Sequence, residues 1–217
     1  MIMPAALSRL LCAALFVLSV AGITGCAGLT TLRSVTEPTD LYDLTPKSTY
    51  DPNLPAIVAQ LVVEEPTAAS SVNTDRIAIK PNRYQVEYFP KARWVDRAPL
   101  LVQTMLVESF ENTGKVAAVG RQAIGLSSEY TLLTDLREFQ AAVGDGENAP
   151  ITVTVQLNMK IVQEPQGLIV ASKSFMHQVP AVSSEMISVV TAFDTALGKT
   201  MRQAVEWTVR RIADITG

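Results

Sequence analysis

The chain has 217 residues, 48% of them hydrophobic, and its 18 lysines and arginines nearly balance 21 aspartates and glutamates, for a formal net charge of −3. This near balance argues against nucleic-acid binding, because no basic block is present to meet phosphates. The single histidine and the two cysteines leave little material for imidazole or thiol chemistry. The length suits one domain that can bury a core without disulfides.

The N-terminus has the pattern of a secretory signal, with a basic residue before a short apolar segment. Arg9 precedes the uncharged segment Leu10 to Val20, and Ile23-Thr24-Gly25-Cys26 follows it. This ending resembles the bacterial lipobox, in which signal peptidase cuts before a cysteine that carries a diacylglycerol. We therefore expect cleavage between Gly25 and Cys26, and lipidation of Cys26.

Two other interpretations of the N-terminal segment stay open. An uncleaved membrane anchor would need about 20 apolar residues to span a bilayer, whereas only 14 residues run from Leu10 to Ile23. An ordinary secretory signal would cut after small residues, which Ala21-Gly22-Ile23 could supply.

The lipoprotein interpretation divides the chain into three parts. Residues 1–25 are the signal peptide, residues 26–40 are the acylated N-terminus and a flexible tether, and residues 41–217 form a single domain. Because Cys12 is removed with the signal and Cys26 is acylated, the folded domain would contain no thiol. Disulfides, thiolate metal sites and cysteine catalysis are therefore not expected.

The N-terminal half of the domain alternates between short strands and one helix. Period-two alternation and turn residues predict the strands and a hairpin. Asp96 is expected to cap a helix with Pro99 in its first turn, and Gly114 to end it. The predicted elements are strands at 41–44, 57–63, 76–80, 84–88 and 116–119, and a helix from Asp96 to about Thr113.

The C-terminal half predicts an antiparallel meander followed by a long helix. Strands are expected at 129–143, 151–161 and 168–179, with turns at 144–148 and 164–167, and a helix at 184–212. Apolar and polar residues alternate strictly in 151–161, so one face is core and the other is wet. The fold class is therefore α+β, with a mostly antiparallel sheet, a C-terminal three-strand meander and two helices packed on one face.

No catalytic constellation stands out. His177 lies in a predicted strand, and no Gly-x-Ser-x-Gly elbow accompanies it, so a packed or surface histidine is the better interpretation. Asp135 and Arg137 share a strand face and are expected to form a structural ion pair. We expect no cofactor, no metal and no enzymatic activity. The uncharged row Thr152, Thr154, Gln156 and Asn158 is either a solvated sheet face or a surface for another protein.

Several segments follow the lipobox in a characteristic order: Leu41-Tyr42-Asp43-Leu44, Arg76-Ile77-Ala78-Ile79, Arg93-Trp94-Val95-Asp96, Pro99-Leu100-Leu101-Val102-Gln103 and Asp135-Leu136-Arg137-Glu138-Phe139. Together they resemble the ABC-type transport auxiliary lipoproteins, the PqiC-like proteins that accompany MCE-domain transport systems. The resemblance covers roughly residues 41–213, and the order of the segments carries it more than any one of them.

The resemblance implies a non-catalytic docking or scaffold subunit of an intermembrane lipid-transport system. Its expected partners are an MCE-domain protein with its ABC permease and ATPase, and a homo-oligomeric ring is compatible with this role. Ala27 lacks the aspartate associated with inner-membrane retention, so we expect a lipid anchor in the outer membrane of a Gram-negative bacterium, facing the periplasm.

Two alternatives to docking have distinct structural signatures. A direct carrier would bind lipid in its own apolar groove between the sheet and the helices. A hydrolase would gather His177, a serine and a carboxylate within hydrogen-bond distance.

Overall fold

The structure is a computed structural model that describes residues 38–121, 128–144 and 150–217. Residues 39–217 form one compact unit with an α+β fold, which confirms the predicted fold class. Its strands are β1 (Asp40–Tyr42), β2 (Ile57–Val63), β3 (Thr67–Ala68), β4 (Arg76–Asn82), β5 (Gln85–Trp94), β6 (Val116–Gly120), β7 (Tyr130–Val143), β8 (Ile151–Gln163) and β9 (Leu168–Pro180). Its helices are α2 (Ala98–Glu111) and α3 (Met186–Thr216).

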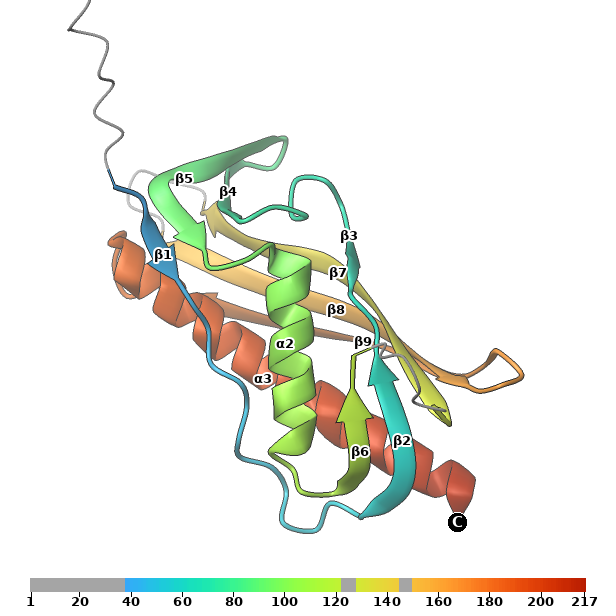
Figure 1. Cartoon of the computed structure of the whole chain (residues 1–217). Helices are drawn as coiled ribbons and strands as arrows, with labels where there is room; N and C mark the ends of the chain where they lie inside the picture. The colour runs from blue at the N-terminus through green and yellow to red at the C-terminus, as the bar shows by residue number, and fades with distance from the viewer. Residues whose placement is uncertain (1–37, 122–127, 145–149) are drawn as a thin grey trace, which may run out of the picture. The chain divides into compact units, whose positions relative to one another are not determined.

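The meander β7–β8–β9 is the largest part of the sheet (Figure 1). Along β8, alternate side chains from Val153 to Ile161 are fully buried under the helices, whereas the residues between them are partly exposed on the other face. This burial follows the period-two pattern of the sequence, because successive side chains of a strand point to opposite faces. The predicted meander and the wet face of β8 are both confirmed.

The N-terminal half joins the sheet through parallel pairs. β2 runs parallel to both β6 and β7, and β4 runs parallel to β7. The antiparallel ladders β4–β5, β7–β8 and β8–β9 are present as expected, so the sheet is mixed. A parallel pair needs a long crossover connection, and the chain between β2 and β6 supplies one that includes α2.

Helix α2 starts one residue later than the sequence pattern indicated, because its N-cap is Arg97 and not Asp96. The helix has no side-chain cap, and Pro99 lies in the first turn. The Asp96 carboxylate accepts a hydrogen bond from the backbone N–H of Arg97 (2.7 Å), so it is used one position before the helix instead of capping it. Gly114 has φ of 60°, the left-handed conformation that ends helices, as its place in the sequence predicted.

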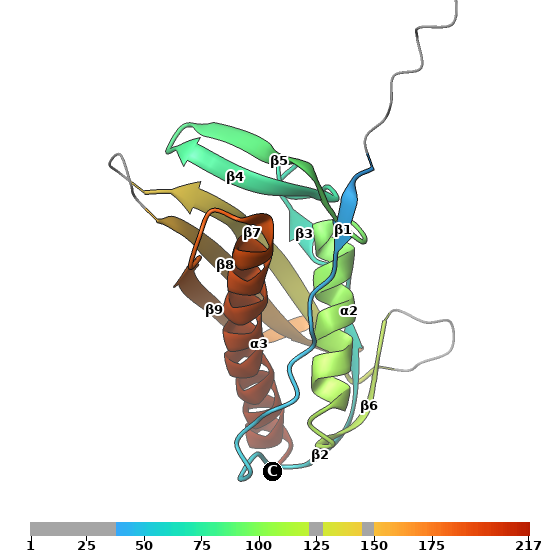
Figure 2. The same cartoon turned by 90° about the vertical axis from the view of Figure 1, so that its left-hand side faces the viewer.

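Helix α3 runs for 31 residues, four more at its C-terminal end than predicted. Ile212, the last residue of the predicted helix, is fully buried, whereas the additional residues 213–216 are half-buried or exposed. Helices α2 and α3 lie side by side on the same face of the sheet (Figure 2).

Three aromatic rings occupy the centre of the layer between the sheet and the helices. Trp94 of β5, Phe139 of β7 and Phe193 of α3 have ring centroids 5.1 to 5.6 Å apart. Two of the pairs are tilted and one is edge-to-face, arrangements that aromatic quadrupoles favour. Trp94 is 2% exposed, so its ring is part of the core.

Residues 45–51 cross the outer side of both helices and fasten them together. The Asp194 carboxylate accepts hydrogen bonds from Thr45, and Tyr50 donates its hydroxyl to the Ser109 carbonyl (2.8 Å). Burial raises the pKa of Tyr50 to about 12, so the hydroxyl keeps the proton that it donates. We call this segment the strap.

Replacing Trp94 by alanine should lower the free energy of unfolding by about 3–5 kcal/mol, because the change leaves a cavity among three elements. Urea denaturation of the mature domain measures the loss. Tyr84→Ala is the matched control, since Tyr84 is 88% exposed and its removal should cost less than about 0.5 kcal/mol. Equal losses in the two variants would contradict the central role of the aromatic rings.

The strap also predicts a pH dependence of stability. The backbone N–H of Asn53 and the guanidinium of Arg210 hold the pKa of Asp51 below its usual range. A carboxyl with a depressed folded-state pKa stabilises the fold above its unfolded-state pKa, and this contribution disappears as the pH falls through the folded-state value. Asp51→Asn should therefore be less stable than the wild type at pH 7 and equally stable in acid. A difference that persists in acid would show another cause.

Candidate functional site

The residue predicted to carry the lipid lies outside the described part of the chain. Cys26 precedes residue 38, where the description begins, so its lipidation stays a prediction. The site that the structure does describe is a surface, and the other candidate residues of the sequence analysis can be placed on or away from it.

His177 is half-buried on β9 beside α3 and does not form a nucleophile–base pair. Its Nδ1 lies 3.1 Å from the Thr200 hydroxyl, and that hydroxyl donates its own proton to the Ala196 carbonyl (2.8 Å). The imidazole must therefore donate from Nδ1, whereas a catalytic base would accept the hydroxyl proton. Burial and the nearby Lys199 lower the pKa of His177. The arrangement is that of a packed histidine.

The arginines near the Arg93-Trp94 motif make ion pairs and ring contacts within the domain. Arg93 pairs with both oxygens of Asp75 at 2.8 and 2.9 Å, and Arg97 pairs with Glu65 at 2.8 Å. The guanidinium of Arg76 lies 3.8 Å from the centre of the Tyr88 ring. Arg93 thus ties the loop before β4 to β5, and Arg97 ties the start of α2 to the segment after β2 and, through a hydrogen bond to Asn73, to the loop before β4, so this part of the resemblance reflects architecture and not a reactive site.

The face of β7, β8 and β9 that points away from the helices carries a ladder of polar side chains. We call it the outer sheet face. Gln178 donates to Thr154 (3.2 Å) and Asn158 donates to Ser174 (2.7 Å), each pair joining neighbouring strands. Met176 lies opposite Gln156 and is 53% exposed. The row of Thr152, Thr154, Gln156 and Asn158 thus lies on one face, as the alternation predicted.

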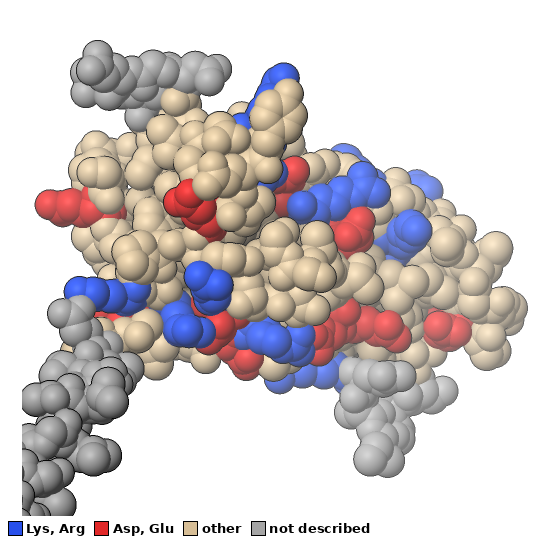
Figure 3. All heavy atoms as spheres, turned by 90° about the horizontal axis from the view of Figure 1, so that it is seen from above, with Lys and Arg blue, Asp and Glu red and all other residues tan. Residues whose placement is uncertain are grey.

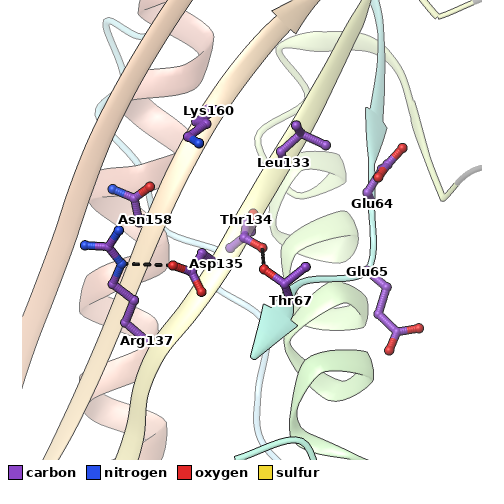
Figure 4. A pocket seen from close by; sticks show the side chains of 9 residues that line it. All are labelled: Glu64, Glu65, Thr67, Leu133, Thr134, Asp135, Arg137, Asn158 and Lys160. Atoms are coloured by element: carbon purple, nitrogen blue, oxygen red, sulfur yellow. Dashed lines mark hydrogen bonds and ion pairs between the residues drawn. The ribbon is translucent and has the colours of Figure 1, made fainter. Parts of the chain in front are cut away.

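A shallow hollow of about 240 Å³ borders the outer sheet face where β2, β3, β7 and β8 meet (Figure 4). Asp135 and Arg137 point toward one another in it and form an ion pair at 2.9 Å, which confirms the predicted pairing. The hollow is lined by Glu64, Glu65, Thr67, Leu133, Thr134, Asp135, Arg137, Asn158 and Lys160.

The hollow suits recognition better than catalysis. The ion pairs of its lining residues, Asp135 with Arg137 and Glu65 with Arg97, are more than two-fifths exposed at all four side chains, and such pairs add at most about 1 kcal/mol each to stability. Mixed charges on an open surface mainly select partners and orient their approach. In the part of the chain that is described, no three metal-binding side chains are placed to hold an ion.

Sequence reasoning found only part of this hollow. Asp135 and Arg137 were recognisable as neighbours on one strand, whereas Glu64 and Lys160 come close to them only through the pairing of β7 with β2 and β8. The polar alternation of β8 placed Lys160 on the wet face. No local signal predicted that the end of β2 would border it.

Within residues 38–121, 128–144 and 150–217, no helix is both long enough and apolar enough to cross a bilayer. The long helix α3 is apolar along the stripe that packs on the sheet, and its other side carries charged residues such as Arg202 and Arg211.

Comparison with known proteins gives a consistent result over nearly the whole domain. Residues 41–205 match the family described as the ABC-type transport auxiliary lipoprotein component. An uncharacterized protein of Bradyrhizobium diazoefficiens is 32% identical over 168 residues, which are 77% of this chain and 44% of that protein. The chain thus spans less than half the length of this relative.

Two solved structures share the fold. Protein XCC0632 from Xanthomonas campestris has a TM-score of 0.77 and 28% identity, over 82% of this chain and 99% of that one. A second, uncharacterized protein has a TM-score of 0.60 at 15% identity, over 81% of this chain and 99% of the other. From the family match over residues 41–205, the chain belongs to the ABC-type transport auxiliary lipoprotein family.

Proposed function

We propose that this protein is a non-catalytic docking subunit of an MCE-type intermembrane lipid-transport system, anchored to a membrane by lipidated Cys26. The family match over residues 41–205 is the observation that carries the proposal. The lipobox at Ile23 to Cys26 supports the anchor, and Ala27 favours the outer membrane over the inner one. The partners would be the MCE-domain protein and, through it, the ABC permease and ATPase.

Docking is favoured over direct lipid carriage by the packing between the two layers. A carrier groove would have to open between the sheet and the helices, where Trp94, Phe139 and Phe193 are in ring contact. The hollows described on the domain surface lie outside this layer and have charged residues in their linings.

The outer sheet face is the surface that we assign to the partner. Two pairs of its side chains, Thr154–Gln178 and Asn158–Ser174, are hydrogen-bonded to each other, so a partner can cover these four residues while their mutual hydrogen bonds stay in place. Met176 adds an exposed apolar contact near the middle of the face. Several copies could also assemble into a ring around the partner.

Replacing Cys26 by serine should release the protein from the membrane, because the acyl chains provide the anchor. Fractionation of cells, with detection of the protein by size, measures the change. Cys12→Ser is the matched control, since it alters the signal without touching the lipid site, and it should leave the mature, membrane-bound form. If the Cys26 variant still fractionates with the outer membrane at the mature size, the lipid is not the anchor.

A photo-crosslinking amino acid at Met176 should capture an MCE-domain protein in cells at native expression. The control position is Glu111, which is exposed at the end of α2 on the helical side of the domain. Mass spectrometry identifies the captured protein. Capture from Glu111 alone would move the contact to the helices, and capture of no MCE protein from either position would contradict the docking role.

A further inference from the structure

Exposed apolar side chains occur on several segments at the end of the domain where the described chain begins. The start of β1, the turn between β4 and β5, and the connection from β9 to α3 all lie at this end (Figures 1 and 2). We call it the tether end. Leu41 is 64% exposed, Tyr84 88%, Val182 99% and Ile187 62%.

These residues belong to three separate segments. Leu41 lies in β1, Tyr84 in the hairpin turn, and Val182 and Ile187 flank the start of α3. Viewed from above, uncharged residues cover much of this end between scattered acidic and basic side chains (Figure 3). Isolated exposed apolar residues are ordinary on protein surfaces, but apolar residues from several segments gathered at one end mark a contact surface.

The opposite end also exposes apolar residues, among them Val58 and Leu168. The length of the segment between Cys26 and residue 39 decides which end of the domain can reach a bilayer. A helix of 31 residues such as α3 is about 46 Å long, so the two ends lie roughly that far apart. Thirteen Cα steps lead from Cys26 to residue 39, and they span at most about 45 Å when fully extended.

A flexible linker of this length has an average end-to-end distance of only about 20 Å. Turning the opposite end toward the bilayer would lift residue 39 by nearly the length of the domain and would require the linker to be almost fully extended. With the tether end down, the linker needs no such extension. The linker therefore selects the tether end as the one that faces the membrane.

The side chains at the tether end suit the interface between lipid tails and water. Tyrosine places its ring among the headgroups while its hydroxyl stays hydrated. The guanidinium of Arg83 lies 5.8 Å from the centre of the Tyr84 ring, so a cation that can meet lipid phosphates sits beside the aromatic residue. Val182 and Ile187 offer purely apolar contacts.

We infer that the tether end, through Tyr84, Val182 and Ile187, rests directly on the lipid surface and orients the domain upright on the membrane. This inference rests on the proposed lipidation of Cys26. In this arrangement the membrane holds the protein by two contacts, the acyl chains and the tether end. The outer sheet face does not contact lipid and is available to bind a protein.

The test uses the mature lipidated protein reconstituted in phosphatidylethanolamine–phosphatidylglycerol vesicles. Cys26 is blocked by its lipid and Cys12 is removed, so a single introduced cysteine takes the only fluorescent label. The tether-end variants are Tyr84→Cys, Val182→Cys and Ile187→Cys, and the matched controls are Val58→Cys and Leu168→Cys. All five positions are exposed, so the labels should leave the fold intact, and circular dichroism checks this.

Nitroxide lipids in the bilayer should quench the tether-end labels about two-fold or more and should leave the control labels unchanged. Equal quenching at both ends, or none at the tether end, in protein that floats with the vesicles would overturn the inference and leave the anchor standing. Unquenched tether-end labels would assign that surface to a protein partner. Protein that fails to float would overturn the lipid anchor and this inference with it.

Discussion

The contact of Trp94, Phe139 and Phe193 is the interaction on which the rest of the domain depends. The three rings come from β5, β7 and α3, which are far apart in the sequence, and no two of these elements are neighbours along the chain. Large aromatic side chains bury more apolar area than any others, so bringing them together fixes these elements more firmly than backbone pairing alone. Strand β5 bends near Lys91, which has a positive φ of 55°, and this bend separates the hairpin from the part of β5 that carries Trp94 into the core.

Because the aromatic rings hold α3 against the meander, the two faces of the meander differ: the inner face packs in the core and the outer face is open to solvent or a partner. The inner face is committed to packing, since β8 alone buries every second side chain from Val153 to Ile161. On the outer face, two pairs of polar side chains are hydrogen-bonded across strands, Asn158 with Ser174 and Gln178 with Thr154. A partner that binds after folding can cover these pairs while their mutual hydrogen bonds stay in place.

The sequence predicted those features that depend on neighbours along the chain. The alternation of residues 151–161, the stop at Gly114 and the pairing of Asp135 with Arg137 are local, so pattern and spacing were sufficient. The parallel pairing of β2 with β7 joins residues about seventy positions apart, such as Leu61 and Tyr130, and no local pattern specifies it. The same long-range pairing brings Glu64 to the hollow, on the opposite side of β7 from Lys160. The Asp96 cap failed for a different reason: its carboxylate bonds to the adjacent N–H of Arg97 instead.

The position of the strap connects the anchor to the rest of the architecture. The chain enters the domain at β1, which pairs with the end of β5 that carries Trp94, and continues as the strap over both helices. If the N-terminus is lipidated, a force on the anchor would therefore be transmitted through β1 and the strap to the three aromatic rings and both helices. Strands β8 and β9 run alongside α3. If the domain stands on its tether end, the outer sheet face is therefore steeply inclined to the membrane plane and does not lie against the lipid surface. In the proposed orientation, a protein partner can contact this face without displacing lipid.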